Sequence, residues 1–380
     1  MCVTNETLLI VGASVRAAAQ SARRAGWKVS AVDLFADVDL QAIAPTWQAS
    51  DYPAGLVAAA AQAPPGPWLY TGGLENHAEV VAAISRTRTL LGNGPAVLQQ
   101  CQAPFDFRHA CIASSLGCVN WCELASETPR DGKWMLKPHA SAGGKGITLY
   151  ERAPYPVAPP THYWEEYIEG VSQSAVYVAS DTGWRLLGVT EQLIGAEWTG
   201  ATGFHYAGSL GPLVLDKIAL VQYQRIGDAL HKRFGLRGLF GVDAIFHASG
   251  ALFPIELNPR YTASIEVLER SLGIHSIHAH VQACRDGQLP KQEYDNLGSE
   301  RPSGKAILYA REALQISPAF ADWCLEENAG SAWPVIADLP AAGTRIEPGQ
   351  PVVTVFATGG CLESARFALR QQAAAVFAHL

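Results

Sequence analysis

Apolar runs joined by alanine-rich helical stretches open the chain. Residues 7–12 (TLLIVG) end in Gly12, an alanine-rich stretch follows at 15–25, and a second apolar run ends near Asp33. Continuous apolar runs of this length are typical of strands buried on both faces of a parallel sheet. The pattern therefore predicts an α/β domain of Rossmann-like type over residues 1–100.

A third strand of this domain is predicted at PWLYTGG, residues 67–73, where the run ends in two glycines beside Glu75 and Asn76. The loops at strand ends of open α/β sheets converge and bind ligands. Glu75 and Asn76 are therefore candidates for a substrate pocket, and the alternative is an ordinary helix N-terminus.

The pattern changes after residue 100 to short strands with glycine-rich turns and few helices, which is typical of an α+β unit. We expect two lobes within residues 101–300, a central one at about 110–165 and a nucleotide and metal lobe at about 166–300. A β-rich segment with a terminal helix is expected over 301–380. The predicted strands are 133–140, 146–152, 162–168, 174–179, 186–193 and 251–258, and one helix is predicted at 218–234.

Composition narrows the class of protein. Hydrophobic residues make up 48% of the chain and charged residues 17%, which excludes a mainly disordered chain. The 28 Lys and Arg against 35 Asp and Glu give a net charge of -7 with no basic block, so nucleic acid is not an expected partner. No apolar stretch reaches the roughly 20 residues of a membrane helix. The eight cysteines form no CxxC pair, and a cytoplasmic location is expected.

A nicotinamide site at Gly12 and Asp33 is not supported. An acid about 20 residues after a glycine turn can hold a ribose, but this turn reads GASVRA and has one glycine where three are needed.

The segment WMLKPHASAGGKGI, residues 134–147, is more informative. Lys137 lies within an apolar strand, where an ammonium group is costly unless it meets an anion. The following glycines allow backbone N–H groups to surround phosphate oxygens, and Lys145 adds a positive charge. Taken alone, a glycine-containing hairpin is the commoner explanation. The candidate phosphate-binding residues are Lys137, Ser141, Gly143, Gly144 and Lys145.

Three oxygen-bearing side chains in GVDAIFHASGALFPIELNPR, residues 241–260, form the strongest pattern. Asp243 lies on one predicted strand, and Glu256 and Asn258 lie two apart on the next, so that they share a face. Hard oxygen donors of this kind suit Mg²⁺, which takes further ligands from nucleotide phosphates. Arg260 follows two residues later and would stabilise negative charge in a reaction.

The order of these pieces, LKPHASAGGKG, EEYIEG, an aspartate and then ELNPR, resembles the ATP-grasp superfamily. The resemblance implies three lobes, ATP and Mg²⁺ (or Mn²⁺) as cofactors, and an enzyme that joins a carboxylate to an amine through an acyl phosphate. It implies that Arg260, Lys137 and Lys145 have catalytic roles and that residues 141–146 form a mobile loop. It further assigns Glu165 and Ile168 to the adenine hinge and Asp243, Glu256 and Asn258 to the metal.

Two departures from the family pattern concern the nucleotide. Most members carry another phosphate-binding lysine where this chain reads QQCQAPFDFRHA, and Gln102 and Arg108 are the nearest substitutes. Many place an acid for the ribose where this chain has Ser172 and Gln173, so Glu169 is the alternative candidate.

The stretches SAVYVA, LLGVTEQLIG and GFHYAGSLGPL are similar to a branch of the superfamily linked to tetrahydromethanopterin and methanofuran one-carbon metabolism, which includes a tyramine-glutamate ligase. This similarity suggests glutamate as the carboxylate and an aryl-ethylamine such as tyramine as the amine, both small-molecule partners. Dimerisation, common among relatives, is expected only by analogy.

Histidine and tyrosine side chains are weaker substrate candidates. His205 and Tyr206 lie among glycines and would touch the amine, or else form loop contacts. His139 beside the glycine loop would bind phosphate or cap a hairpin. Two rival functions stay open: an ATP-grasp carboxylase that activates bicarbonate, and a protein that binds ATP without turnover.

Overall fold

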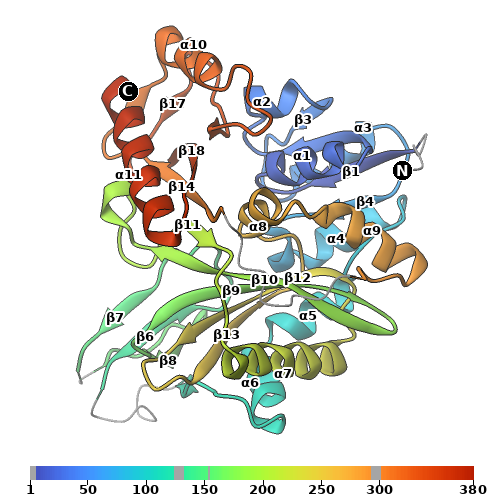
Figure 1. Cartoon of the computed structure of the whole chain (residues 1–380). Helices are drawn as coiled ribbons and strands as arrows, with labels where there is room; N and C mark the ends of the chain where they lie inside the picture. The colour runs from blue at the N-terminus through green and yellow to red at the C-terminus, as the bar shows by residue number, and fades with distance from the viewer. Residues whose placement is uncertain (1–5, 124–131, 153–154, 292–300) are drawn as a thin grey trace.

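The computed structural model describes residues 6–123, 132–152, 155–291 and 301–380. The molecule has three parts: an N-terminal α/β domain, a small antiparallel sheet and a long antiparallel sheet (Figure 1). The long sheet runs through the middle of the molecule and connects the other two parts.

The N-terminal domain is a four-stranded parallel sheet of order β3-β2-β1-β4. Its central strand β1 (Thr7–Val11) holds Leu8, Leu9, Ile10 and Val11 fully buried, because helices cover both faces. The other strands are β2 (Lys28–Asp33), β3 (Thr46–Gln48) and β4 (Trp68–Tyr70), and the helices are α1 (Arg16–Arg24), α2 (Val38–Gln41), α3 (Gly55–Gln62), η1 (Leu74–Asn76) and α4 (Ala78–Ser85).

A smaller four-stranded antiparallel sheet of order β5-β8-β6-β7 follows two linking helices. Trp134 and Trp164 form its apolar centre at 3% and 0% exposure. The expected strand at 162–168 ends earlier, at Glu166. The elements are α5 (Pro95–Gln102), α6 (Pro104–Ala113), β5 (Trp121–Cys122), β6 (Trp134–Pro138), β7 (Thr148–Tyr150) and β8 (His162–Glu166).

The long sheet has eight strands in the order β13-β12-β9-β10-β11-β14-β18-β16. Strand β11 (Tyr206–Gly211) pairs with β14 (Ser303–Tyr309), so the C-terminal segment expected at 301–380 continues the sheet of the preceding lobe. The remaining strands are β9 (Val171–Ser180), β10 (Gly183–Ile194), β12 (Gly238–Phe246), β13 (Leu252–Asn258), β16 (Ile336–Ala337) and β18 (Pro351–Thr358), while β15 (Leu314–Gln315) and β17 (Arg345–Ile346) form a separate pair. Its helices are η3 (Glu197–Thr199), α7 (Lys217–Phe234), α8 (Ile265–Leu272), α9 (Ser276–Asp286), α10 (Pro318–Glu327) and α11 (Leu362–His379).

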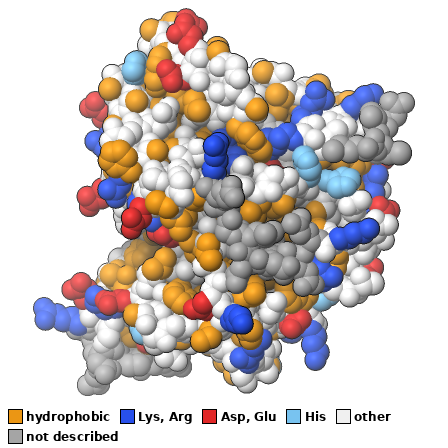
Figure 2. Space-filling model, in the orientation of Figure 1, with side chains coloured by type: hydrophobic (Ala, Val, Ile, Leu, Met, Phe, Trp, Pro, Cys, Tyr) orange, Lys and Arg blue, Asp and Glu red, His pale blue; other side chains and the backbone are white. Residues whose placement is uncertain are grey.

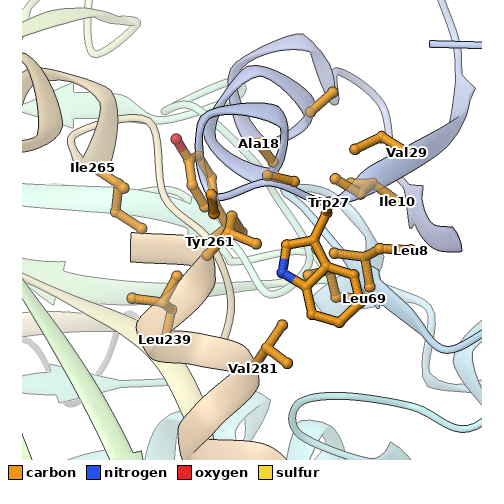
Figure 3. Packing of buried hydrophobic residues seen from close by; sticks show 14 of the residues in the cluster. Leu8, Ile10, Ala18, Trp27, Val29, Leu69, Leu239, Tyr261, Ile265 and Val281 are labelled. Atoms are coloured by element: carbon orange, nitrogen blue, oxygen red, sulfur yellow. The ribbon is translucent and has the colours of Figure 1, made fainter. Parts of the chain in front are cut away.

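A shared apolar core fixes the N-terminal domain to the long sheet. Trp27 and Val29 of the N-terminal domain pack in one cluster with Tyr261, Ile265 and Val281, which come from the region of α8 and α9 (Figure 3). Each of these side chains is at most 6% exposed. Burial of this cluster holds the loops of the N-terminal domain at a defined position above the strands of the long sheet.

A buried ion network reinforces the same junction. Arg16 on α1 is 1% exposed, and its Nε donates to Asp338 Oδ1 at 2.8 Å while its Nη2 donates to Glu266 Oε2 at 3.2 Å. Lys305 on β14 also donates to Glu266 Oε2, at 2.9 Å. The network joins α1, α8 and the C-terminal strands, and it supplies each buried charge with partners of the opposite sign.

Lys and Arg are interspersed with Asp and Glu over the face shown in Figure 2. Among the helices of the described residues, none is both long enough and apolar enough to span a bilayer.

Candidate functional site

A cleft of about 1840 Å³ lies between the three parts of the molecule. Single-ligand pockets usually measure about 300–1,000 Å³, so this volume accommodates a nucleotide and a second molecule. The residues named from the sequence that line it are Glu75, Asn76, Arg108, Lys137, His139, Ser141, Gly143, Gly144, Lys145, Glu165, Ile168, Ser172, Tyr206, Asp243, Glu256, Asn258 and Arg260. Glu169 and His205 are not among the lining residues.

Asp243, Glu256 and Asn258 come together on one face of the β12–β13 hairpin. Asp243 lies directly across from Glu256 in the register of the two strands. The Nδ2 of Asn258 donates to Asp243 Oδ2 at 3.3 Å. The arrangement follows from the two-residue period of β13, which turns positions 256 and 258 toward the same side as position 243.

The two carboxylates of this hairpin disfavour each other's charge. The pKa of Asp243 is raised because burial disfavours its charged form, against hydrogen bonds from Ser174 and Gln192. The pKa of Glu256 is raised to about 7 by desolvation between the walls of the open cleft and by the neighbouring Asp243 carboxylate, although Lys137 opposes this change. A divalent cation between the two carboxylates would relieve their repulsion, and their oxygens together with that of Asn258 fit Mg²⁺.

No cluster of three His, Cys, Asp or Glu side chains suited to a metal occurs in the described part of the chain. The pair Asp243 and Glu256 is instead completed by an amide. Such a site lacks ligands of its own for a full octahedral shell, so a bound Mg²⁺ would need water and nucleotide phosphates as further ligands.

Lys137 on β6 is paired with the fully buried Glu165 on β8, with 2.7 Å between Nζ and Oε1. Glu165 accepts a second hydrogen bond from Arg108 through Oε2. Burial alone would lower the pKa of Lys137, but the carboxylate of Glu165 outweighs it and holds this pKa above its ordinary value. Lys137 is therefore a permanent cation at the wall of the cleft.

Arg108 lies on α6 at 3% exposure and lines the cleft. It lies in the segment QQCQAPFDFRHA, where the family pattern has a second phosphate-binding lysine that this chain does not have. Its side chain contacts Glu165 beside Lys137. The side chain of Gln102, the other substitute, is outside the described residues. Arg108 thus lies at the wall of the cleft beside Lys137.

The glycine loop between β6 and β7 is folded against two other segments. Asn76 Nδ2 donates to the backbone oxygen of Ser141 at 3.2 Å, and the backbone N–H of Tyr206 donates to Gly143 O at 3.0 Å. Gly144 has a φ of +77° and approaches Phe204 so closely that a Cβ would lie 1.9 Å from Phe204 O. The loop thus closes over the cleft with Lys145 exposed on it.

The segment between β8 and β9 connects the two sheets across the cleft. Ile168 lies in this connection and lines the cleft. Glu169 is 73% exposed and pairs with Lys133 at 3.0 Å outside it. At the expected ribose position, Ser172 lines the cleft, whereas Gln173 is buried and accepts a hydrogen bond from Tyr223.

The histidines differ in their surroundings. His139 is exposed at the cleft, 5.2 Å from the ring of Tyr163. The ring of His205 lies 6.0 Å from that of Tyr309. His280 is buried on α9, where its Nδ1 accepts from Leu239 N at 2.8 Å and its Nε2 lies 3.0 Å from Leu91 O. His280 therefore has a structural role.

Arg260 and Glu75 form an ion pair at the N-terminal side of the cleft, with 2.5 Å between Nη2 and Oε1. The same Nη2 donates to Asn258 Oδ1 at 2.8 Å. Burial would lower the pKa of Arg260, but Glu75 raises it above its ordinary value. Tyr52 also lines this end of the cleft. Tyr52 was not predicted, because it lies in a loop without a motif.

Comparison with known proteins identifies the fold. Residues 115–264 match the family model of the ATP-grasp domain. Among curated proteins, none matches the chain.

Solved structures resemble nearly the whole chain. The biotin carboxylase domain of Hydrogenobacter thermophilus 2-oxoglutarate carboxylase, in complex with MgADP, ADP and bicarbonate, has a TM-score of 0.73 at 14% identity, over 96% of this chain and 89% of that one. The L-amino acid ligase of Bacillus licheniformis has a TM-score of 0.70 at 14% identity, over 97% of both chains. An N5-carboxyaminoimidazole ribonucleotide synthetase in an ADP complex has a TM-score of 0.71 at 15% identity, over 100% of this chain and 98% of that one. The predicted fold class is confirmed: the chain has the ATP-grasp fold with an N-terminal Rossmann-like domain.

Proposed function

We propose that the protein is an ATP- and Mg²⁺-dependent ligase that joins a carboxylate to an amine. The match of residues 115–264 to the ATP-grasp domain and the fold of the chain support this proposal. One observation carries the proposal: the cations Lys137 and Arg260 and the oxygen cluster of Asp243, Glu256 and Asn258 face a single cleft. Charges of both signs around one cleft suit a metal-bound polyphosphate.

The nucleotide would lie with its adenine at the connection near Ile168 and its phosphates between Lys137 and the glycine loop. Mg²⁺, bound by Asp243, Glu256 and Asn258, would neutralise charge on the terminal phosphates. Lys137 keeps its proton at physiological pH, because Glu165 raises its pKa. One N–H of its ammonium donates to Glu165, and the other two can donate to phosphate oxygens without a change of protonation.

The reaction would proceed in two steps within the same cleft. A substrate carboxylate attacks the γ-phosphate, which gives ADP and an acyl phosphate, and the amine then displaces inorganic phosphate to form the amide. Lys137, Lys145 and Arg260 would balance the charge on the moving phosphoryl group and on the tetrahedral adduct. The closed glycine loop would exclude water, which otherwise hydrolyses the acyl phosphate.

Glutamate and an aryl-ethylamine such as tyramine are the substrates we propose, within one-carbon cofactor synthesis. Aromatic side chains at the cleft support an aromatic amine, since Tyr52, Phe35 and Tyr206 line it. Such side chains can contact the ring of an aromatic ligand in edge-to-face or offset-stacked geometry.

A carboxylase-like reaction on bicarbonate is the second candidate. The observation in its favour is the likeness of nearly the whole chain to a biotin carboxylase domain that was solved with bicarbonate. Bicarbonate would then take the position of the carboxylate and form carboxyphosphate.

An assay of ADP release separates these functions. Purified protein with MgATP and glutamate should release ADP faster when tyramine or another amine is added, and mass spectrometry should detect the amide. ADP release that depends on bicarbonate and not on the amine would favour the carboxylase. ATP binding without turnover on either set would contradict both reactions.

A further inference from the structure

Three buried polar atoms without hydrogen-bond partners lie at the ion pair of Glu75 and Arg260, two in the pair itself and one on Tyr52. Within the described residues, these atoms are Glu75 Oε2, Arg260 Nε and the hydroxyl of Tyr52. Buried polar groups are nearly always hydrogen-bonded, so three such atoms at one end of a cleft indicate a place where a ligand supplies the partners. Glu75 itself is only 7% exposed.

The loop after β4 keeps these atoms close to each other. A Cβ at Gly73, which has a φ of +94°, would lie 2.2 Å from the hydroxyl oxygen of Tyr52. A Cβ at Gly72 would lie 3.4 Å from Arg260 Cζ. The backbone of this loop thus runs directly against both side chains, immediately before Glu75.

This group of atoms lies next to the expected phosphate site. Arg260 Nη2 donates to Glu75 Oε1 at 2.5 Å and to Asn258 Oδ1 at 2.8 Å. A single guanidinium group therefore separates Glu75 from one of the proposed metal ligands. A molecule bound at Glu75 would be adjacent to the reacting end of the nucleotide.

The free atoms differ in their hydrogen-bonding character. Arg260 Nε can only donate, while Glu75 Oε2 can only accept as long as Glu75 is ionised. The pKa of Tyr52 is raised to about 12 by burial and by the Glu75 carboxylate. Its hydroxyl is therefore neutral and has lone pairs that can accept an N–H. Bicarbonate or a carboxylate would meet the like charge of Glu75.

We infer that Glu75 Oε2 and the hydroxyl of Tyr52 bind the protonated primary amine of the second substrate, while Arg260 Nε faces the acyl group. The inference rests on the proposed ligase function and assigns the amine to this end of the cleft. One ion pair then orients both reactants, the amine at its anionic member and the acyl phosphate at its cationic member. The ammonium gives one proton to Glu75 or to water before its nitrogen attacks, and the second N–H proton lost on amide formation leaves with the phosphate.

Recognition through N–H donors has a consequence for specificity. A primary ammonium group offers three donors, whereas a trimethylammonium group has the same charge and none. A site that only attracts positive charge would accept both. The site at Glu75 and Tyr52 should reject the methylated form, because its two acceptors would be left unpaired.

The test measures amine binding to protein saturated with MgADP. Calorimetric titration would use a panel of tyramine, ethanolamine, putrescine and the amino acids, with choline and the trimethylammonium form of tyramine as analogues without N–H groups. We expect a member of the panel to bind, Glu75→Gln to weaken it about tenfold or more, and Tyr52→Phe to weaken it about threefold or more. Glu79→Gln, which removes the charge of a 73% exposed side chain nearby, should leave binding unchanged.

Three results would overturn the inference: no panel member binds the wild type, Glu75→Gln and Tyr52→Phe both bind the amine as tightly as the wild type, or the trimethylammonium form binds equally well. MgADP affinity of each variant reports whether it is folded, and Glu75→Asp should retain part of the amine affinity. ADP release is measured separately. If the amine binds in a way that depends on Glu75 but no turnover occurs, the amine site is supported and the ligase function is overturned. If turnover occurs and Glu75→Gln binds the amine as tightly as the wild type, only the amine site is overturned.

Discussion

The ammonium of Lys137 and the carboxylate of Glu165 lie 2.7 Å apart at the wall of the cleft, and Glu165 is completely buried. Arg108 contacts the same carboxylate from α6. One anion therefore holds two cations at the wall where the phosphates are expected. Removal of that anion would take away the carboxylate that the two cations share.

We predict that Glu165→Gln destabilises the protein by about 3–5 kcal/mol, the usual cost of breaking a buried ion pair on one side. Urea or thermal unfolding measures the loss. Glu166→Gln provides a control, since Glu166 is the neighbouring acid and its carboxylate contacts Asn120 at an exposed position. Equal stability of the two variants would contradict the structural role of Glu165.

The oxygen cluster on β12 and β13 gives a second prediction. Asp243→Asn and Glu256→Gln should each lower Mg²⁺-dependent ADP release about 100-fold or more, because each removes a charged ligand of the metal. Titration of the enzyme with Mg²⁺ at fixed ATP measures the effect. Asp286→Asn removes the same charge from an exposed position on α9 and should have no effect. Activity of Asp243→Asn that matches this control would exclude the proposed metal site.

Closure of the glycine loop can be tested with two alanine substitutions. Gly143 and Gly144 have similar φ angles, +63° and +77°, but only at Gly144 would a Cβ collide with another segment, at Phe204 O. The backbone strain is therefore similar in both variants, about 1 kcal/mol. We expect Gly144→Ala to lower kcat about tenfold or more below that of Gly143→Ala. Equal kcat values would show that close contact with Phe204 is not needed for turnover.

Stability should depend on pH through His280. Burial lowers the pKa of His280 from 6.5 to about 4, although the hydrogen bond to Leu91 opposes this change. The unfolded chain therefore binds a proton between about pH 6.5 and pH 4 while the folded protein does not, and stability falls as pH is lowered through this window. The loss amounts to about 3 kcal/mol.

Urea unfolding at a series of pH values measures this dependence. His280→Gln should flatten the slope between pH 6.5 and pH 4, because glutamine does not titrate. His278→Gln, two residues earlier on α9 and exposed, should keep the slope of the wild type. A slope that is unchanged in His280→Gln would contradict the assignment.

Local patterns predicted the parts of the fold that depend on neighbouring residues. The apolar run of β1 indicated a buried parallel strand, and the two-residue spacing of Glu256 and Asn258 indicated a shared face, which the hairpin has. Both follow from side-chain periodicity within a single element. The ATP-grasp fold was predicted from such motifs in their order along the chain.

Relationships between distant segments were not predictable in this way. The pairing of β11 with β14 joins segments about a hundred residues apart, and no local pattern specifies it. The ion pair of Glu75 with Arg260 likewise spans two domains, since each residue alone is an ordinary polar side chain. Arg16 at the start of α1 is buried because its guanidinium contacts Glu266 of α8 and Asp338, two residues far from it along the chain.

A crystal structure with a non-hydrolysable ATP analogue and Mn²⁺ tests the central claim most directly. We expect anomalous density about 2.1 Å from oxygens of Asp243, Glu256 and Asn258, with the terminal phosphates on the same ion and adjacent to Lys137. A nucleotide bound elsewhere, or a metal ion held without any of these three residues, would contradict it.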